Sequence, residues 1–450
     1  MEASRAKLVM GLAGALAALG AAVVLLHLQV RPVPTWFYVF AWYPTLAILD
    51  LLIVWLGGAS LLARPGVLLP MLWWSTVIWL LFEAINFRLQ DWYYVFLPAS
   101  RAERWIGITL SLATVVPAIL LPERLLERLG AWRSLTTAPL RRRDGELTYA
   151  FTLGAATLGA TLALPRYLHP LTWGAVWLIA EPLLYRTDPA ASLFGDMRRG
   201  EWGRIARLLV AGLLAGVIWE TFNAHARGKW IYTVPFLERL KVFEMPLVGF
   251  LGFPFFALEV WSLYHLLAPR TRAGPLLASA AFAVAVLLGI DHWTVSSTAP
   301  RLADLPGVSA PTIAELRQAG LDDVFGIAGL PAGELVHRAG LDTIEARRAQ
   351  RSAELSTLRG IGTQHAADLM AGGITTVASL AAATPEAIYR AARRGPRPTL
   401  AEVREWLRAA RTAVSDLPAS GDAASAPWSP GPPITGPSVP APDRRRPSPP

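Results

Sequence analysis

The stretch "WETFNAHARGKWIYTVP", residues 219–235, follows a long apolar run and places a carboxylate and an amide one helical turn apart. Its polar and aromatic letters recur in "FEAINFRLQDWYYVFLP", residues 82–98. Both stretches contain aromatic-Glu-x-x-Asn, then Trp-x-Tyr, then a Pro that follows the Asn by 12 residues. Shared spacing at this many positions predicts that the chain contains two copies of one module.

The similarity continues upstream of both stretches, in the same order along the chain. Trp42 precedes Asp50 by eight residues, as Trp173 precedes Glu181, and an Ala-Ser-Leu sequence follows in each copy. We therefore expect a duplicated four-helix module. An even number of spans in each module predicts that the two copies run parallel, related by an axis along the membrane normal.

The composition places the chain among polytopic membrane proteins with an all-α helix bundle. Of its 450 residues, 53% are hydrophobic and 18 are Trp, and the mean hydropathy is +0.39. The apolar residues are concentrated before residue 297. The absence of Cys excludes disulfides, thiolate metal sites and Cys nucleophiles.

A membrane-spanning helix needs roughly 20 mostly apolar residues, and the sequence predicts about nine such spans. They are Leu8–Val30, Trp36–Leu56, Val67–Phe87, Trp105–Leu121, Thr148–Pro165, Leu168–Leu184, Ile205–Ala224, Phe243–Leu267 and Pro275–Trp293. Lys and Arg, including the run Arg141, Arg142 and Arg143, are more numerous in the loops on the side of the N-terminus. This bias predicts a cell-membrane protein with a cytoplasmic N-terminus, and an odd span count then puts the C-terminal region outside.

Polar residues within or beside these spans form the candidate site. They are Asp50, Glu83, Asn86, Glu181, Glu220, Asn223 and Glu259. A charged side chain in a membrane helix costs roughly 2.5–3.5 kcal/mol, so such residues tend to face the bundle interior. Each Glu-x-x-Asn pair shares one helix face, and both members can accept hydrogen bonds from a Trp or Tyr of the following loop.

Two interpretations of these residues stay open. In one, the carboxylates surround a central polar cavity and bind a cation or carry a proton. In the other, they form an internal network that locks the helices together and anchors the aromatic loops at the membrane interface. The Glu-Asn pairs and the deeper Asp50 and Glu259 are expected in two layers rather than one.

The region after residue 300 is soluble in character and contains a second duplication. "LPGVSAPTIAELRQAGLDDV", residues 305–324, aligns without gaps with "LRGIGTQHAADLMAGGITTV", residues 358–377. The second copy, with its Leu-x-Gly-Ile-Gly turn and the following Ala-x-x-Leu helix, resembles the helix-hairpin-helix family. The resemblance implies a small soluble domain in which Gly360, Ile361 and Gly362 hold a DNA phosphate through backbone N–H groups.

Two features of the sequence limit that implication. In the first copy Ser309 stands where the second Gly of the turn belongs. Basic residues around the second turn are few, whereas a DNA-binding surface is densely basic. A protein partner or a scaffold role is therefore considered beside DNA.

The predicted domains follow from these boundaries. They are a first repeat (1–140), a second repeat (141–270), a ninth span with a linker (271–300), a tandem helix-hairpin-helix domain (301–414) and a disordered Pro-rich tail (415–450).

Standard catalytic motifs are absent from the sequence. It contains no P-loop, no His-Glu-x-x-His and no Gly-x-Ser-x-Gly, and its seven His show no metal-ligand spacing. No metal and no cofactor is expected, and membrane lipid is an expected partner. Three functions remain: a binding or transport module for an unknown small molecule or ion, a membrane-embedded enzyme acting on a lipid or isoprenoid, and an anchor that presents the hairpin domain to DNA or protein.

Overall fold

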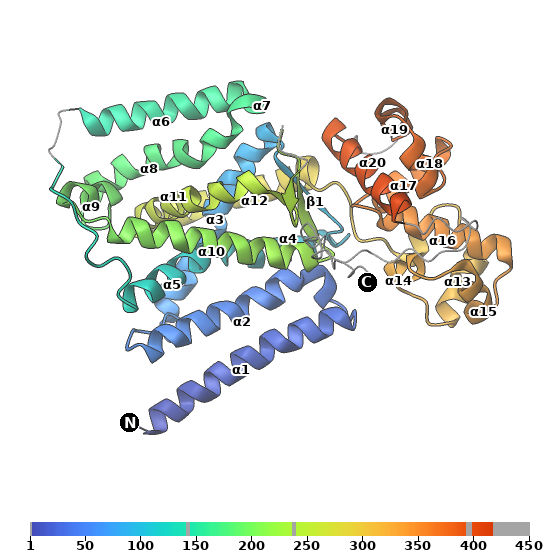
Figure 1. Ribbon diagram of the computed structural model, residues 1–450, viewed down its shortest axis with the longest axis horizontal. Helices are drawn as coiled ribbons and strands as arrows, with labels where there is room; N and C mark the ends of the chain where they lie inside the picture. Colours follow the sequence, from blue (N-terminus) through green and yellow to red (C-terminus); the bar gives the residue numbers. More distant parts are fainter. Residues whose placement is uncertain (1, 141–144, 236–239, 393–397, 417–450) are drawn as a thin grey trace, which may run out of the picture.

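The computed structural model describes residues 2–140, 145–235, 240–392 and 398–416 (Figure 1). Two predictions fall outside this range: the Arg141–Arg143 run and the Pro-rich tail beyond Asp416. Within the range the chain is almost entirely helical. The all-α prediction is therefore confirmed.

A helical bundle occupies the chain up to Thr294. Its first part contains α1 (Glu2–His27), α2 (Val33–Trp55), α3 (Pro65–Leu89), β1 (Trp92–Val95), α4 (Arg101–Leu112) and α5 (Val115–Arg128). Its middle part contains α6 (Glu146–Ala163), α7 (Pro165–Leu168), η1 (His169–Leu171), α8 (Thr172–Thr187), α9 (Leu193–Arg199), α10 (Gly203–His225) and β2 (Lys229–Tyr232). Its last part contains β3 (Lys241–Val242), β4 (Met245–Pro246), η2 (Leu247–Leu251), α11 (Gly252–Leu267), α12 (Ala273–Gly289) and η3 (Ile290–Thr294).

The C-terminal region consists of shorter helices. They are η4 (Leu302–Asp304), α13 (Ala310–Gln318), α14 (Val324–Ala328), α15 (Ala332–Ala339), α16 (Thr343–Thr357), α17 (Gly362–Ala371), α18 (Val377–Ala382), α19 (Pro385–Ala391) and α20 (Leu400–Ser415). Two separate cores hold this region together. One is built around Leu316 and Leu335, the other around Leu369 and Trp406.

Seven helices of the described chain are long and apolar enough to cross a membrane. They are Arg5–His27, Val33–Trp55, Pro65–Leu89, Arg101–Arg128, Gly203–His225, Leu247–Leu267 and Ala273–Thr294. The other two predicted spans fall on α6 and α8, which have only 18 and 16 residues. Nine spans therefore stay a prediction, whereas a membrane location is compatible with the seven.

The bundle helices pack as a series of neighbours. α1 lies on α2, α2 on α5, α5 on α10, α10 on α11, α11 on α8 and α8 on α6, while α3 contacts α5, α11 and α12. Large apolar side chains such as Met10, Leu69 and Leu277 are more than 60% exposed on its outer surface. An apolar exterior of this kind suits contact with lipid. Figure 1 shows the N-terminus and the C-terminal region at opposite ends of the bundle.

A short two-stranded ribbon lies at the end of the bundle that faces the C-terminal region (Figure 1). β1 pairs with β2 in antiparallel register, with Trp92 opposite Tyr232 and Tyr94 opposite Trp230. α3 ends at Gln90, which adopts a left-handed conformation (φ 58°) and turns the chain into β1. The two Trp-x-Tyr motifs, expected as interfacial loops, are thus strands that pair with each other.

Candidate functional site

Glu83 is completely buried near the end of α3, where three side chains donate hydrogen bonds to one of its oxygens. The indole Nε1 of Trp79 lies 2.8 Å from Oε1, that of Trp92 lies 3.0 Å away and the hydroxyl of Tyr94 lies 2.5 Å away. Oε2 has no hydrogen-bond partner among the described residues. The expectation that the loop aromatics donate to this carboxylate therefore matches the geometry.

Glu220 occupies the matching place on α10 and is also completely buried. Its Oε1 accepts a hydrogen bond from the hydroxyl of Tyr232 at 3.0 Å. In both motifs the Tyr belongs to the strand that follows the helix. Each strand of the ribbon therefore donates a hydrogen bond to the carboxylate of the helix before it. Its Oε2 also lacks a hydrogen-bond partner within the described part of the chain.

The two Asn side chains fasten the ribbon to the helix ends. The Nδ2 of Asn86 donates to the carbonyl oxygen of Trp92 at 2.9 Å, and its Oδ1 accepts from the backbone N–H of Asp91 at 2.9 Å. Asn223 bonds the carbonyl oxygen and the N–H of Trp230, each at 3.0 Å. Because each amide satisfies backbone groups of a strand, these contacts favour the network interpretation for both Asn.

Asp50 and Glu181 lie away from the ribbon, towards the other end of the bundle, and each holds the turn that follows its own helix. Asp50 accepts from the hydroxyl of Ser60 and the backbone N–H of Leu61, both at 2.6 Å. Glu181 accepts from the hydroxyl of Ser192 and from the N–H of Phe194 at 2.8 Å. The repeated Ala-Ser-Leu sequence thus supplies a hydroxyl donor to a buried carboxylate in both copies.

Glu259 stands apart from these pairs in the middle of α11. It is completely buried, and its Oε1 accepts from the backbone N–H of Trp177 at 3.3 Å. The structure therefore brings together Glu83, Glu220 and the two Asn at the ribbon, and leaves the other three carboxylates elsewhere. Two layers were expected from the sequence, and Glu259 lies near Glu181, because Ser262, three residues further along α11, donates a hydrogen bond to Glu181.

A cavity of about 410 Å³ lies beside the ribbon, and we call it the aromatic cavity. Aromatic rings supply much of its wall, namely those of Trp79, Trp92, Tyr94, Trp173, Trp230 and Phe256. Three of these side chains are the donors to Glu83. The carboxylate therefore fixes part of the wall of the cavity without itself lining it.

A polar pair lies at one edge of the aromatic cavity. The Oδ2 of Asp91 is 3.7 Å from the Nδ1 of His169, and both residues line the cavity. Burial raises the pKa of Asp91 to about 7, so its charge changes near neutral pH. Sequence analysis missed this pair because the two residues come from different copies, and no local spacing connects them.

A smaller cavity of about 70 Å³ lies in contact with the same ribbon. It shares Tyr94, Trp230 and Tyr232 with the aromatic cavity, and Glu220 is among its lining residues. The two cavities thus lie against common side chains of the ribbon.

The candidate phosphate-binding turn lies between α16 and α17 and is buried against the bundle. A Cβ added at Gly360 would lie 2.3 Å from Cγ1 of Val95 in β1, and one added at Gly362 would lie 2.7 Å from Cβ of Ser297. Ile361 is completely buried. In this arrangement the turn serves as a docking surface between the two regions, and DNA has no access to it.

Five charged residues surround this contact, and we call them the interdomain charge cluster: Lys229, Lys241, Glu244, Arg359 and Glu405. Arg359, which immediately precedes the turn, donates to both oxygens of Glu244 at 2.9 and 2.5 Å and to Glu405 at 3.4 Å. Lys229 lies 3.4 Å from Glu244, and Lys241 lies 2.9 Å from Glu405. Burial alone would raise the pKa of Glu244, but Arg359 and Lys229 outweigh it and hold that pKa at about 2.

A second ion pair joins the bundle to the C-terminal region beside the cluster. Arg227, which follows α10, donates to both carboxylate oxygens of Asp323 at 2.8 and 2.7 Å. Its guanidinium carbon also lies 4.2 Å from the centre of the Phe325 ring. Bidentate pairing of this type fixes the orientation of two segments as well as their distance.

Comparison with known proteins identifies one part of the chain. A family model described as a domain of unknown function (DUF4332) matches residues 306–413. No curated protein and no solved structure matches the chain. The matched residues comprise both hairpin copies, and the resemblance to the helix-hairpin-helix family stays a prediction.

Proposed function

We propose that this chain is a multi-pass membrane protein, built on two copies of a four-helix module, that binds an apolar chain-like ligand from the bilayer. The observation that carries the proposal is the aromatic cavity of about 410 Å³ with its single polar edge at Asp91 and His169. Ligand sites typically measure roughly 300–1,000 Å³ and combine apolar walls with a few polar groups.

Residues on the outer surface of the bundle support entry from the lipid phase. Val248, Leu251 and Phe255 line the aromatic cavity and are 55%, 65% and 55% exposed. These apolar side chains belong to η2 and α11, which form a span by length and composition. A ligand dissolved in the bilayer would therefore meet apolar residues on its way to the cavity.

The contacts of Glu83 favour a binding protein over a cation carrier. One oxygen of this carboxylate is already occupied by Trp79, Trp92 and Tyr94. Its role in the proposal is to hold these three side chains in place, because a precise site needs its walls fixed by supporting hydrogen bonds. The anchor hypothesis receives less support, since the second hairpin turn is buried against the bundle.

The proposal is tested with cis-parinaric acid, a fluorescent polyene fatty acid, titrated into the purified protein in detergent. Gly174 lines the cavity with open space at its Cβ position, so Gly174→Leu should fill the cavity without a clash. We expect binding by the wild type and about tenfold weaker binding by Gly174→Leu, a loss of roughly 1.4 kcal/mol.

The matched control is Gly159→Leu on the exposed face of α6, where the Cβ position is also open. This variant should bind cis-parinaric acid as the wild type does. Equal affinities for the wild type, Gly174→Leu and Gly159→Leu would show that the fatty acid binds elsewhere and would overturn the proposal.

A further inference from the structure

A further cleft lies at the end of the bundle opposite the C-terminal region, where α5 ends and α10 begins (Figure 1). It has a volume of about 540 Å³ and lies between the end of α5, residues 130–137 and the start of α10. Four arginines line it, namely Arg128, Arg133, Arg204 and Arg207. We call it the arginine cleft. It shares no lining residue with the aromatic cavity.

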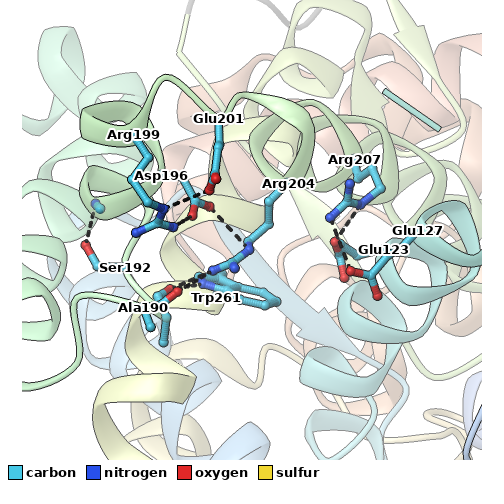
Figure 2. Close-up of polar contacts among 12 residues, drawn as sticks. Glu123, Glu127, Ala190, Ser192, Asp196, Arg199, Glu201, Arg204, Arg207 and Trp261 are labelled. Atoms are coloured by element: carbon cyan, nitrogen blue, oxygen red, sulfur yellow. Dashed lines mark hydrogen bonds and ion pairs between the residues drawn. The ribbon is translucent and has the colours of Figure 1, made fainter. Parts of the chain in front are cut away.

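The carboxylates of the arginine cleft are already paired, as Figure 2 shows for part of the network. The Nε of Arg204 lies 3.2 Å from Oδ2 of Asp196, and the Nε of Arg199 lies 2.8 Å from Oε2 of Glu201. Arg207 is bound to Glu123 at 2.8 Å and lies 3.7 Å from Glu127. Each acidic side chain that lines the cleft therefore has an arginine partner, although Arg207 is shared by Glu123 and Glu127.

Arg128 and Arg133 carry charge that no carboxylate offsets. Both line the cleft, and neither forms an ion pair with a described residue. Arg133 donates to the backbone carbonyl oxygen of Glu127 at 3.2 Å, which orients its guanidinium without neutralising it. An anion that enters the cleft thus meets two unneutralised cations.

The wall that carries Arg133 is held in a fixed conformation. The N–H of Trp202 donates to the carbonyl oxygen of Leu135 at 3.0 Å, and its Nε1 donates to the hydroxyl of Thr137 at 2.9 Å. A Cβ at Gly203 would lie 2.6 Å from the carbonyl oxygen of Trp132, so the two segments are in close contact. A preformed wall lowers the entropy lost when a ligand binds.

A cleft of mixed polarity adjoins the arginine cleft, and Glu123, Arg124 and His265 are among its polar lining residues. Its volume is about 400 Å³, it shares Glu127 and Arg204 with the arginine cleft, and Met71, Leu120 and Tyr264 are among its lining residues. Both clefts lie where apolar helices end, since α5 ends at Arg128 and α10 begins at Gly203. A cationic pocket beside a cleft that presents Met71, Leu120 and Tyr264 among polar residues matches a molecule with an anionic head and an apolar chain.

We propose that the arginine cleft binds the headgroup of an anionic phospholipid. Arg128 and Arg133 bind its phosphate, and one acyl chain lies along Met71, Leu120 and Tyr264. Arg204 and Arg207 shape the cleft through their internal ion pairs and do not neutralise the lipid. This site is independent of the ligand that we propose for the aromatic cavity.

The test is native mass spectrometry of the full chain in detergent micelles containing equal amounts of phosphatidylglycerol and phosphatidylcholine. The wild type should retain phosphatidylglycerol preferentially. Arg128→Gln/Arg133→Gln should reduce that preference by about 30-fold, because each basic residue near a membrane surface attracts anionic lipid by roughly 1 kcal/mol. Arg128→Lys/Arg133→Lys, which keeps both charges, should retain most of it.

The matched control is Arg270→Gln/Arg272→Gln, which removes two exposed arginines outside the cleft. It should leave the lipid preference unchanged. An unchanged preference in Arg128→Gln/Arg133→Gln, or an equal loss in the control, would overturn the proposal. In a further arm, inorganic phosphate is added to the wild type in micelles that contain phosphatidylcholine alone. The melting temperature of the wild type is then measured with inorganic phosphate and, separately, with phosphatidylglycerol. An equal rise with both would show that the site takes a free anion and that the lipid assignment is wrong.

Discussion

The two halves of the ribbon differ although their motifs agree. Trp79 lies four residues before Glu83 and donates a hydrogen bond to it, whereas Gly216 lies four residues before Glu220. The place of a side chain at Gly216 is taken by Phe253, whose Cδ2 would lie 2.1 Å from an added Cβ. In the first motif the space beside the Glu is filled by the indole of Trp79 on the same helix. In the second motif the corresponding space is filled by the ring of Phe253 on α11.

The residue before each Trp of the ribbon shows the same divergence. Asp91, before Trp92, lies at the polar edge of the aromatic cavity, while Lys229, before Trp230, belongs to the interdomain charge cluster. The shared residues thus build the ribbon, and the residues that differ give its halves separate tasks. Both halves line the aromatic cavity, and Val95 of the first half meets Gly360 of the C-terminal region. In our account the first half adds the polar edge of the cavity, and the second half adds a cation to the docking contact.

The largest effect is expected at the docking contact of the second half. Arg359→Ala leaves Glu244 and Glu405 buried without their guanidinium, and removing one partner of a buried pair costs roughly 3–5 kcal/mol. Because the chain has no native Cys, spin labels at Ala99→Cys and Gln364→Cys can report the separation of the two regions. We expect Arg359→Ala to lengthen and broaden the measured distance distribution.

Arg227→Ala is the matched comparison for this variant. Its partner Asp323 is about one-third exposed, and partly exposed ion pairs contribute only about 1 kcal/mol or less. It should shift the distance distribution far less than Arg359→Ala. Identical distributions for the wild type and both variants would show that the charge cluster does not hold the C-terminal region in place.

The next effect concerns the two matching carboxylates. Glu83→Ala leaves three buried donors without an acceptor, while Glu220→Ala removes the acceptor of Tyr232. Each unsatisfied buried group costs about 1–3 kcal/mol. The free energy of unfolding, measured by SDS titration in mixed micelles, should therefore fall by about 3 kcal/mol or more for Glu83→Ala and clearly less for Glu220→Ala. Equal losses of unfolding free energy in Glu83→Ala and Glu220→Ala would contradict the proposed difference between the two carboxylates.

A smaller effect is expected from pH. The pKa of Glu244 lies at about 2 in the folded protein, below the usual value of about 4.3 for a Glu. Its contribution to docking is therefore fully present above that usual value and is lost as the pH falls towards 2. The spin-label distances should stay constant down to about pH 5 and broaden below it. Glu244→Gln should lack this transition, and a transition of the same size in that variant would assign it to other groups.

The sequence predicted the local part of the site well. The spacing of Glu83, Asn86, Trp92 and Tyr94 lies within one helix end and the strand after it, so helical periodicity and the repeat were enough to group these residues. Asp50 and Glu181 were found in the same way.

The sequence did not predict contacts between segments that lie far apart in the chain. The pairing of β1 with β2, the approach of His169 to Asp91 and the docking of Gly360 on Val95 all join residues that lie far apart in the sequence. No local pattern encodes such pairs, because each depends on how the modules pack. The family resemblance implied a phosphate-binding turn, with a protein partner or a scaffold role considered beside DNA, and in the structure the turn is buried at an interface.

The account makes the aromatic cavity the ligand site, and one titration tests that claim most directly. Cis-parinaric acid is titrated into the wild type, into Gly174→Leu in the aromatic cavity and into Ser111→Leu in the smaller cavity. We predict that Gly174→Leu weakens binding by about tenfold and that Ser111→Leu leaves it unchanged. Weaker binding in Ser111→Leu with normal binding in Gly174→Leu would contradict the account.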